Sequence, residues 1–334
     1  MSLHRPGNDP HRLSVVVVAP RVAGLEDTLV SVLEHRPDDC DIIVALGERY
    51  DDPWQIGDEV TFVNADRRSG LVGCATAGLA VATGDVIHLL AAGWKATADW
   101  TAAAMTHFTR PDVAAVVPLA MRADDAARPV ATGVRRTSGG RSIVVVPRLT
   151  DAGVVTGSPP HAPLLEAGFW RAETLRSIGI SSACGDALAA ADLAAGLKAS
   201  GGTVAVEPAC TVIAGPMAKR PSSFRAGLHA ERLFWRSLPC ERTIPASIFH
   251  ATEIVRHAVA TAPLGTVGML AGRLAALLHV GSCRARTRQL RDLLTASKHG
   301  SADAHARTFR IDAPHDSASP PHAAPRPREL KRSA

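Results

Sequence analysis

Aromatic side chains are scarce in this chain of 334 residues: they make up 4% of the sequence and include a single tyrosine. Proteins that bind single-stranded nucleic acid by stacking bases need exposed rings, so the composition argues against such a platform. The net charge of +5 is modest, and much of its excess of arginine lies late in the chain. Those late clusters indicate a solubilising tail, and no nucleic-acid partner is expected.

Paired cysteines and long apolar runs are also missing. The six cysteines are widely separated, which argues against a zinc site or a disulfide framework and favours reduced thiols. Residues 1–12 lack an apolar signal core, and the apolar stretch 258–280 is broken by proline, glycines, arginine and histidine. The sequence therefore predicts a cytoplasmic protein, with peripheral attachment to the inner face of a membrane as the alternative.

Several common catalytic motifs are absent. No Gly-x-Gly-x-x-Gly or Gly-x4-Gly-Lys-Ser/Thr pattern occurs, which argues against a Rossmann dehydrogenase and a P-loop enzyme. No Gly-x-Ser-x-Gly pattern occurs either, which argues against an α/β hydrolase.

Strand and helix patterns alternate over the first 120 residues. Apolar runs predict buried strands at 13–19, 41–46, 60–63, 85–90 and 113–119, and helical spacing predicts helices at 24–36, 70–83 and 97–108. This alternation is typical of βαβ units, so we expect an α/β fold with a mainly parallel, doubly wound sheet and helices on both faces.

The later part of the chain has a different pattern. Amphipathic helices without intervening strands are predicted at 222–238, 245–261 and 264–294, and a stretch rich in His, Pro, Ser and Ala follows. The predicted organisation is a flexible N-terminus (1–12), an α/β domain (13–218), a helical C-terminal extension (219–296) and a disordered tail (297–334).

The order of these elements, with several short motifs, resembles the family 2 glycosyltransferases, which have the GT-A fold. Gly70-Leu71 is similar to the start of the family's Gly-Leu helix, and Gly84-Asp85 to the approach to its metal motif. Residues 168–171 resemble the acceptor-side segment, and Asp192-Leu193 matches the residues after the catalytic acid pair. The resemblance covers about residues 13–215. It implies a GT-A-like domain that binds a nucleotide sugar and passes its sugar to a glycan or lipid-linked acceptor.

The resemblance also implies positions for nucleotide contacts. Pro20 ends the first strand, where the family has a loop over the nucleotide, and Glu48 is the acid nearest to the place of the family's base- and ribose-binding aspartates. Gly70 and Thr76 match positions on the Gly-Leu helix, with threonine where the family has asparagine.

The metal-binding motif of the family is degenerate in this chain. Two aspartates separated by one residue would hold a divalent metal at the end of the strand 85–90, and Ala91 and Gly93 occupy their places. Mg²⁺ or Mn²⁺ is therefore expected only if another ligand set exists. Asp85 lies at the wrong end of that strand, and His88 lies in its middle, where a core histidine is the expected interpretation.

A general base for the acceptor hydroxyl is the second chemical requirement. The family's acid pair is replaced by Ala189-Ala190, which leaves Asp192 and Asp186 as the candidate catalytic residues. The alternatives are that Asp192 is a helix-surface acid and that Asp186 caps the helix beginning at Ala187. Arg135, Arg136 and Arg141 could neutralise phosphate in place of a metal, although solvated hairpin charges are the simpler interpretation.

Two functional hypotheses follow. The first is a family 2-like glycosyltransferase with a divergent active site. The second is a pseudoenzyme that keeps the fold as a scaffold for a glycan, a nucleotide or a partner, since the departures from the family pattern cluster at the site. Residues 222–294 could contact a membrane surface or a protein partner, although core packing is the simpler interpretation.

Overall fold

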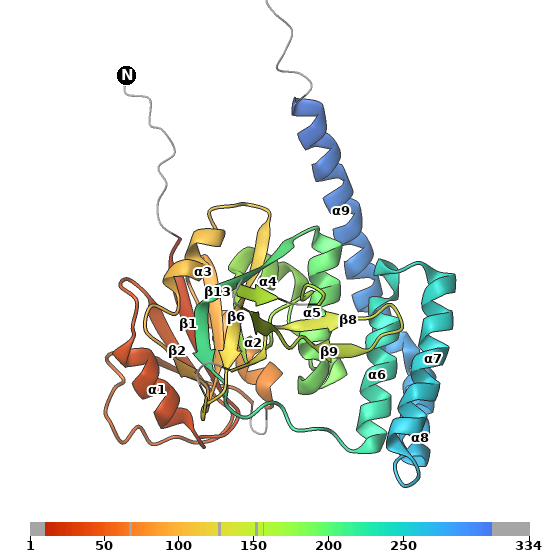
Figure 1. The fold of residues 1–334 in the computed structure, drawn as a ribbon, viewed down its shortest axis with the longest axis horizontal. Coiled ribbons are helices and arrows are strands. Elements are labelled where there is room, and N and C mark those ends of the chain that lie inside the picture. The colour runs from red at the N-terminus through yellow and green to blue at the C-terminus, as the bar shows by residue number, and fades with distance from the viewer. Residues whose placement is uncertain (1–10, 67–68, 126–127, 151–152, 156, 309–334) are drawn as a thin grey trace, which may run out of the picture. The chain divides into compact units, whose positions relative to one another are not determined.

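The structure is a computed structural model that describes residues 11–66, 69–125, 128–150, 153–155 and 157–308 (Figure 1). Its strands are β1 (Leu13–Ala19), β2 (Asp41–Leu46), β3 (Thr61–Asn64), β4 (Val86–Ala91), β5 (Lys95–Ala96), β6 (Val113–Met121), β7 (Pro129–Ala131), β8 (Val134–Arg136), β9 (Ser142–Val144), β10 (Arg148–Thr150), β11 (Gly153–Val155), β12 (Ala167–Arg171) and β13 (Thr203–Ile213). Its helices are α1 (Leu25–Glu34), α2 (Leu71–Val81), α3 (Ala102–His107), α4 (Ala172–Ile178), α5 (Asp186–Ser200), α6 (Ser223–Ser237), α7 (Thr243–Thr261), α8 (Thr266–Leu278) and α9 (Arg284–Thr308), with short 3-10 turns η1 (Ser182–Cys184), η2 (Leu238–Cys240) and η3 (Val280–Cys283).

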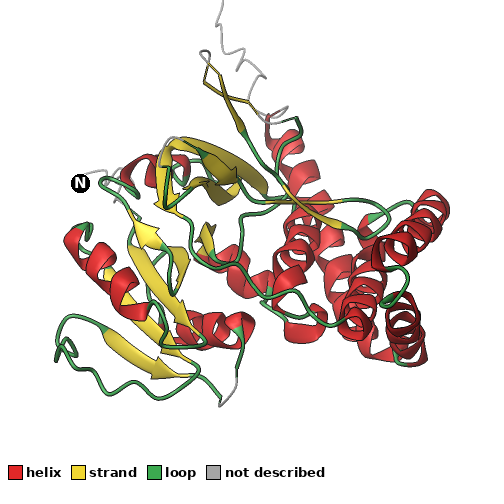
Figure 2. Cartoon of the chain, turned by 60° about the horizontal axis from the view of Figure 1, so that its bottom comes forward, coloured by secondary structure: helices red, strands yellow, loops and turns green. Residues whose placement is uncertain are grey.

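Four strands form the parallel half of a nine-stranded sheet, in the order β3-β2-β1-β4. Every residue of β1 is buried, as expected for a strand with helices over both faces of its sheet. Val16 of β1 lies in register between Ile43 and Leu89. Figure 2 shows strands of the sheet side by side, flanked by helices. The α/β fold class predicted from the sequence is confirmed for this half.

Strand β12 makes the sheet mixed, because it pairs antiparallel with both β4 and β6. The sequence gives residues 164–170 no strand assignment, since a short apolar run has no periodicity that reveals a distant partner. Because β12 runs antiparallel to β4, its beginning lies at the edge of the sheet where β4 ends, with Ala167 opposite Leu90.

Several element boundaries differ from the sequence prediction. β13 runs from Thr203 to Ile213, and its pairing with β6 shifts between Glu207 and Thr211 around Pro208, which has no N–H to donate. The helix predicted at 264–294 is broken into α8, η3 and α9. α9 continues across the predicted boundary at 297 to Thr308, while 1–10 and 309–334 lie outside the described residues. The domain boundary near 218 stays a prediction.

His88 lies in the middle of β4 and belongs to the core. Its side chain is fully buried, and its ring contacts those of Trp100 and Phe169 at centroid distances of 4.6 and 3.9 Å. Burial lowers the pKa of His88 to about 3, which keeps the ring neutral. Neither ring nitrogen has a hydrogen-bond partner among the described residues. The core interpretation of His88 is therefore correct.

A buried polar network centred on Glu231 of α6 holds the helices of the C-terminal extension together. This carboxylate accepts hydrogen bonds from Trp235 Nε1 at 2.9 Å, His250 Nε2 at 3.0 Å and Arg273 NH1 at 2.7 Å, so it connects α6, α7 and α8. Within the described ranges no single helix is long and apolar enough to cross a membrane, although Thr266–Leu278 and Val280–Lys298 pass that test as a pair bent by 67°.

The Glu231 network predicts acid sensitivity. Burial by itself would raise the pKa of Glu231, but the hydrogen bonds and charges of His250 and Arg273 outweigh burial and leave the pKa below its ordinary 4.5. Because the pKa of Glu231 is lower in the folded protein than in the unfolded chain, the ionised carboxylate stabilises the fold above pH 4.5. This contribution is lost as the pH falls through the folded-state pKa. The drop in urea midpoint between pH 7 and about pH 3.5 should therefore be smaller in Glu231→Gln than in the wild type. An equal drop in both would contradict this account, and the exposed Glu173→Gln serves as the control.

Candidate functional site

Three of the predicted nucleotide-site residues meet at the edge of the sheet where the parallel strands end. Glu48 Oε1 accepts the backbone N–H of Val22, two residues after Pro20, at 2.7 Å. A Cβ placed on Gly47 would lie 2.9 Å from the carbonyl oxygen of Pro20 and 2.9 Å from that of the residue before Gly70. The loops after β1 and β2 and the start of α2 are thus in close contact, as the parallel topology requires.

Thr76 does not belong to this group. Its side chain is exposed on α2, and its hydroxyl donates to the carbonyl oxygen of Val72 at 2.8 Å. The resemblance assigned Thr76 to the nucleotide site, and the structure places its side chain on the exposed surface of α2.

The chain after β13 packs closely against Gly93, one of the two positions that the resemblance assigns to the metal motif. Gly93 has a φ of +87°, and a Cβ added to it would lie 2.9 Å from Pro216 Cδ. A Cβ on Gly215 would lie 2.1 Å from the carbonyl oxygen of Gly93, so the chain after β13 crosses directly over the motif. Trp94 Nε1 donates to the carbonyl oxygen of Pro216 at 3.2 Å and fixes this crossing. Ala91 is itself 4% exposed, so the motif offers neither ligands nor room for them.

No group of three or more His, Cys, Asp and Glu side chains that could hold a metal ion occurs in the part of the chain that the structure describes. The side chains at this edge therefore do not fit the divalent cation that GT-A enzymes with an Asp-x-Asp motif use.

A carboxylate that the sequence analysis missed lies beside the motif. Glu166 immediately precedes β12, and its backbone oxygen accepts the N–H of Ala91 at 2.8 Å. Its side chain is 6% exposed and accepts the N–H of Ala218 at 3.1 Å. Burial raises the pKa of Glu166, the hydrogen bond from Ala218 opposes that rise, and the charge of Asp186 adds to it. A buried acid with a raised pKa at a strand end is typical of a general base.

One signal in the sequence could have identified Glu166. It is the single acidic residue in the otherwise apolar run 162–170. A lone acid in a segment destined for burial requires a specific partner or a specific function.

Asp186 caps a helix, but not the helix predicted. α5 begins at Asp186 itself, after Gly185, and has no side-chain cap. The Asp186 carboxylate instead accepts the backbone N–H groups of Leu71 and Val72, each at 3.1 Å, and so caps α2 across the fold. A carboxylate at a helix N-terminus satisfies unpaired donors and interacts favourably with the helix dipole. Asp186 therefore lies close to Gly70 at the sheet edge, with both oxygens engaged.

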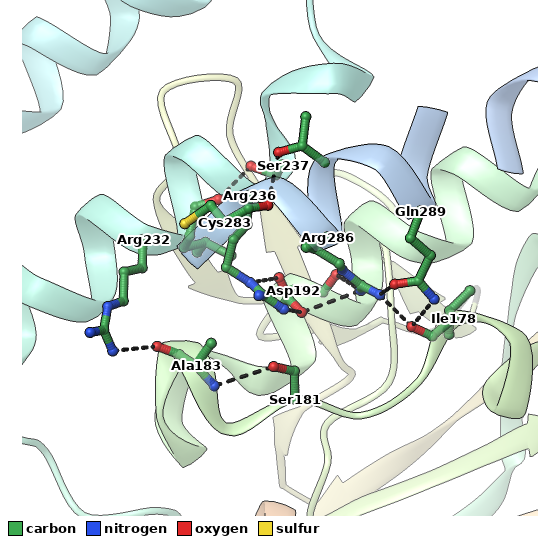
Figure 3. Close-up of polar contacts among 12 residues, drawn as sticks. Ile178, Ser181, Ala183, Asp192, Arg232, Arg236, Ser237, Cys283, Arg286 and Gln289 are labelled. Carbon is green, nitrogen blue, oxygen red and sulfur yellow. Dashed lines mark hydrogen bonds and ion pairs between the residues drawn. The ribbon is translucent and has the colours of Figure 1, made fainter. Parts of the chain in front are cut away.

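Asp192 is neither a surface acid nor a free base. It is 2% exposed, and its carboxylate accepts Arg236 Nε at 3.0 Å and Arg236 NH2 at 2.9 Å (Figure 3). Arg286 NH2 lies 3.3 Å from the same carboxylate. Burial would lower the pKa of Arg236, but the hydrogen bond and charge of Asp192 outweigh burial and raise it. This carboxylate is thus committed to a buried ion cluster that joins α5, α6 and α9.

The hairpin arginines do not replace the metal. Arg136 is buried and pairs with Glu241, while Arg141 Nε lies 3.5 Å from Glu253 Oε1. Both acids belong to the helical extension, so these arginines attach the β8–β9 hairpin to it. They are neither at the motif nor fully solvated.

A pocket of about 200 Å³ lies between this hairpin, the first turn of α5 and the helices of the extension. Its lining includes Arg141, Leu188, His229, Arg256 and His257. A Cβ placed on Gly185 would lie 2.5 Å from His229 Cε1, and the neighbouring Asp186 caps α2 beside Gly70, so this pocket adjoins the Gly70 side of the sheet edge.

Comparison with known proteins shows the fold. No protein-family model matches the sequence, and no curated protein sequence matches it. The structure is similar to that of S. aureus TarS 1–349, with a TM-score of 0.55 at 11% identity over 87% of this chain and 92% of that one. TarS 1–349 in complex with UDP-GlcNAc gives a TM-score of 0.53 at the same identity and coverage.

A second neighbour is GalNAc-T7 with UDP, GalNAc and Mn²⁺, with a TM-score of 0.51 at 15% identity over 74% of this chain. The match spans about half of that protein, 55% of its length. These neighbours are GT-A-fold glycosyltransferases, so the predicted GT-A-like architecture is confirmed.

Removing the Asp192 carboxylate should destabilise the whole fold. Asp192→Asn leaves two buried arginines without their counter-charge, which we expect to cost about 3–5 kcal/mol of unfolding free energy. Urea denaturation followed by circular dichroism measures this loss. Asp51→Asn breaks an exposed pair with Arg49 and should leave the urea midpoint unchanged. A midpoint for Asp192→Asn equal to that of the control would refute the structural role.

Restoring an aspartate to the motif should not restore metal binding. Gly93→Asp places a side chain against Pro216 at a positive φ, and we expect the backbone strain alone to cost about 1–3 kcal/mol. The double variant Ala91→Asp/Gly93→Asp should show no heat of Mn²⁺ binding in calorimetry. Gly281→Asp is the matched control, since a Cβ there meets nothing within 4 Å and stability should not change. Tight Mn²⁺ binding by the double variant would contradict the packed crossing.

Proposed function

We propose that this protein is a divergent family 2-type glycosyltransferase that takes a nucleotide-sugar donor at the edge where the parallel strands end, with Glu166 as the base for the acceptor. The buried carboxylate of Glu166, beside the degenerate motif of a GT-A fold, is the observation that carries this proposal. Its raised pKa suits a group that takes a proton near neutral pH.

The proposed reaction needs one proton acceptor and one leaving group. The hydroxyl oxygen of the acceptor attacks the anomeric carbon of the donor sugar while its proton passes to Glu166. The bond from the anomeric carbon to phosphate breaks, and the nucleoside diphosphate leaves. Pro20, Glu48 and Gly70 line the edge where the nucleotide would lie. The residues at Ala91 and Gly93 supply no ligand for a metal, and no step is assigned to one.

The acceptor, a glycan or a lipid-linked sugar, would enter from the side of the 200 Å³ pocket. That pocket adjoins Asp186, which neighbours Gly70 and influences the pKa of Glu166. We also place the protein in the cytoplasm, where its six free cysteines would stay reduced.

A pseudoenzyme is the second candidate function. The observation that favours it is the crossing of Gly215 and Pro216 over Gly93, which fills the place where the family binds its cation. A protein that keeps the fold and loses the cation site would bind a nucleotide, a glycan or a partner without transferring sugar.

Calorimetry against UDP, GDP and their sugars, with and without Mn²⁺, separates these functions when it is combined with an assay for released nucleoside diphosphate. We expect binding of a nucleotide sugar that does not depend on Mn²⁺, and turnover that rises with pH as Glu166 loses its proton. Glu166→Gln should bind the donor unchanged but lose at least about a hundredfold in turnover, whereas the exposed Glu173→Gln should keep both.

The other outcomes are equally clear. Donor binding without turnover in the wild type would favour the pseudoenzyme. No binding of any nucleotide or nucleotide sugar would refute the donor site, and wild-type turnover in Glu166→Gln would refute the base.

A further inference from the structure

The α7–α8 hairpin exposes an unusual amount of apolar surface. Nineteen large apolar side chains are exposed among the described residues, and twelve of them lie between 244 and 280. Leu264, at the tip between the two helices, is 97% exposed, and Ile244 and Leu278 are each 77% exposed. Core packing, the simpler interpretation of the sequence, therefore does not account for these helices.

The exposed side chains follow the spacing of helix faces. On α7 Ile244, Ile248, Val255 and Val259 keep a helical spacing, as do Val267, Leu270, Leu274 and Leu278 on α8, and Phe249 and Leu277 next to them in sequence are exposed as well. The opposite faces are buried, since His250 of α7 contacts Glu231 and a Cβ on Gly272 of α8 would lie 1.9 Å from the carbonyl oxygen of Phe224 in α6. Figure 1 shows α7 and α8 side by side, away from β1 and β2. The two stripes therefore form one apolar face, which we call the hairpin face.

Positive charge predominates in the sequence of the hairpin and of the segment that follows it. From 242 to 291 the sequence has seven arginines and one acidic residue, Glu253. That acid is neutralised by Arg141 and Arg256. Arg273 and Arg286 are buried against Glu231 and Asp192. The other arginines are exposed: Arg242, Arg256, Arg284, Arg288 and Arg291.

We propose that the hairpin face docks on the surface of a bilayer that contains anionic lipids. An amphipathic helix lies in the interface when its apolar face enters the acyl boundary and its cations meet the headgroups. The exposed leucine, isoleucine and valine side chains can enter the acyl boundary, and the exposed arginines can meet the headgroups. The absence of unpaired acids from 242 to 291 removes the repulsion that anionic headgroups would otherwise meet.

A second copy of this chain fits the same face less well. Isologous contact brings the same patch of each copy together, so the arginines around one hairpin face would oppose those of the other. Like charges at an interface oppose association, whereas anionic headgroups are attracted by them. Charge complementarity therefore selects the lipid surface.

Flotation of the full chain with vesicles tests the proposal without any nucleotide sugar, so its outcome is independent of the proposed enzymatic function. The vesicles contain phosphatidylcholine alone or with an equal part of phosphatidylglycerol. We expect the protein to float with the anionic vesicles, to bind neutral vesicles at least about tenfold more weakly, and to dissociate as salt rises.

Two kinds of variant separate the contributions. Val259→Glu/Leu264→Glu puts charge into the hairpin face at exposed positions and should lower vesicle affinity at least about tenfold. Arg288→Ala should lower it about fivefold and weaken the salt dependence. Trp54→Glu, at a 60% exposed apolar residue of the β2–β3 loop, is the matched control and should bind as the wild type does. Thermal unfolding should be the same for all four proteins.

Three results would overturn the proposal. One is wild-type vesicle binding by the double variant. Another is equal binding to neutral and anionic vesicles at every salt concentration. The last is a dimer in light scattering that the double variant dissociates while vesicle binding is absent, which would assign the hairpin face to a second copy.

Discussion

The buried carboxylate of Asp192 is the interaction on which the arrangement of this protein depends. It lies on α5, which packs against the sheet, and it neutralises Arg236 of α6 and Arg286 of α9. A buried guanidinium needs a counter-charge, because desolvation of a single ion costs several kcal/mol. The three helices can therefore come together only in an arrangement that brings both arginines to this one acid. That junction attaches the helical extension to α5, and the Glu231 network then places α7 and α8 against α6.

At the edge of the sheet where β4 ends, Ala91 and Gly93 offer no metal ligand, whereas the buried carboxylate of Glu166 lies nearby. Where an Asp-x-Asp motif would stand, a positive φ at Gly93 lets the backbone after β13 cross at close range, and Pro216 occupies the space of a side chain. One strand away, Glu166 stays buried, with the backbone N–H of Ala218 on its carboxylate. Metal ligation and proton transfer are separate requirements of glycosyl transfer, so a chain can lose the first and keep a group suited to the second.

The helical extension has two opposite faces with different chemistry. Its inner side is held by ion pairs and by the network around Glu231, which connects α6, α7 and α8. Its outer side is apolar and bordered by arginines that have no acidic neighbours in sequence from 257 to 291. Specific polar contacts fix the helices in one arrangement, and that rigidity lets their outer side chains act as one continuous surface.

The sequence by itself determined the parallel strands β1 to β4 and their alternation with helices, because these follow from local apolar periodicity. The resemblance to the GT-A fold pointed to Ala91 and Gly93, which offer no metal ligand, and to Pro20, Glu48 and Gly70, which parallel topology brings to one edge. Tertiary structure decided the rest. Whether Asp192 is a base or an ion-pair partner depends on Arg236 and Arg286, which are 44 and 94 residues away in the chain. Asp186 was free to cap its own helix and caps α2 instead. Glu166 became a candidate base only when β12 entered the sheet antiparallel, and no local pattern encodes that pairing.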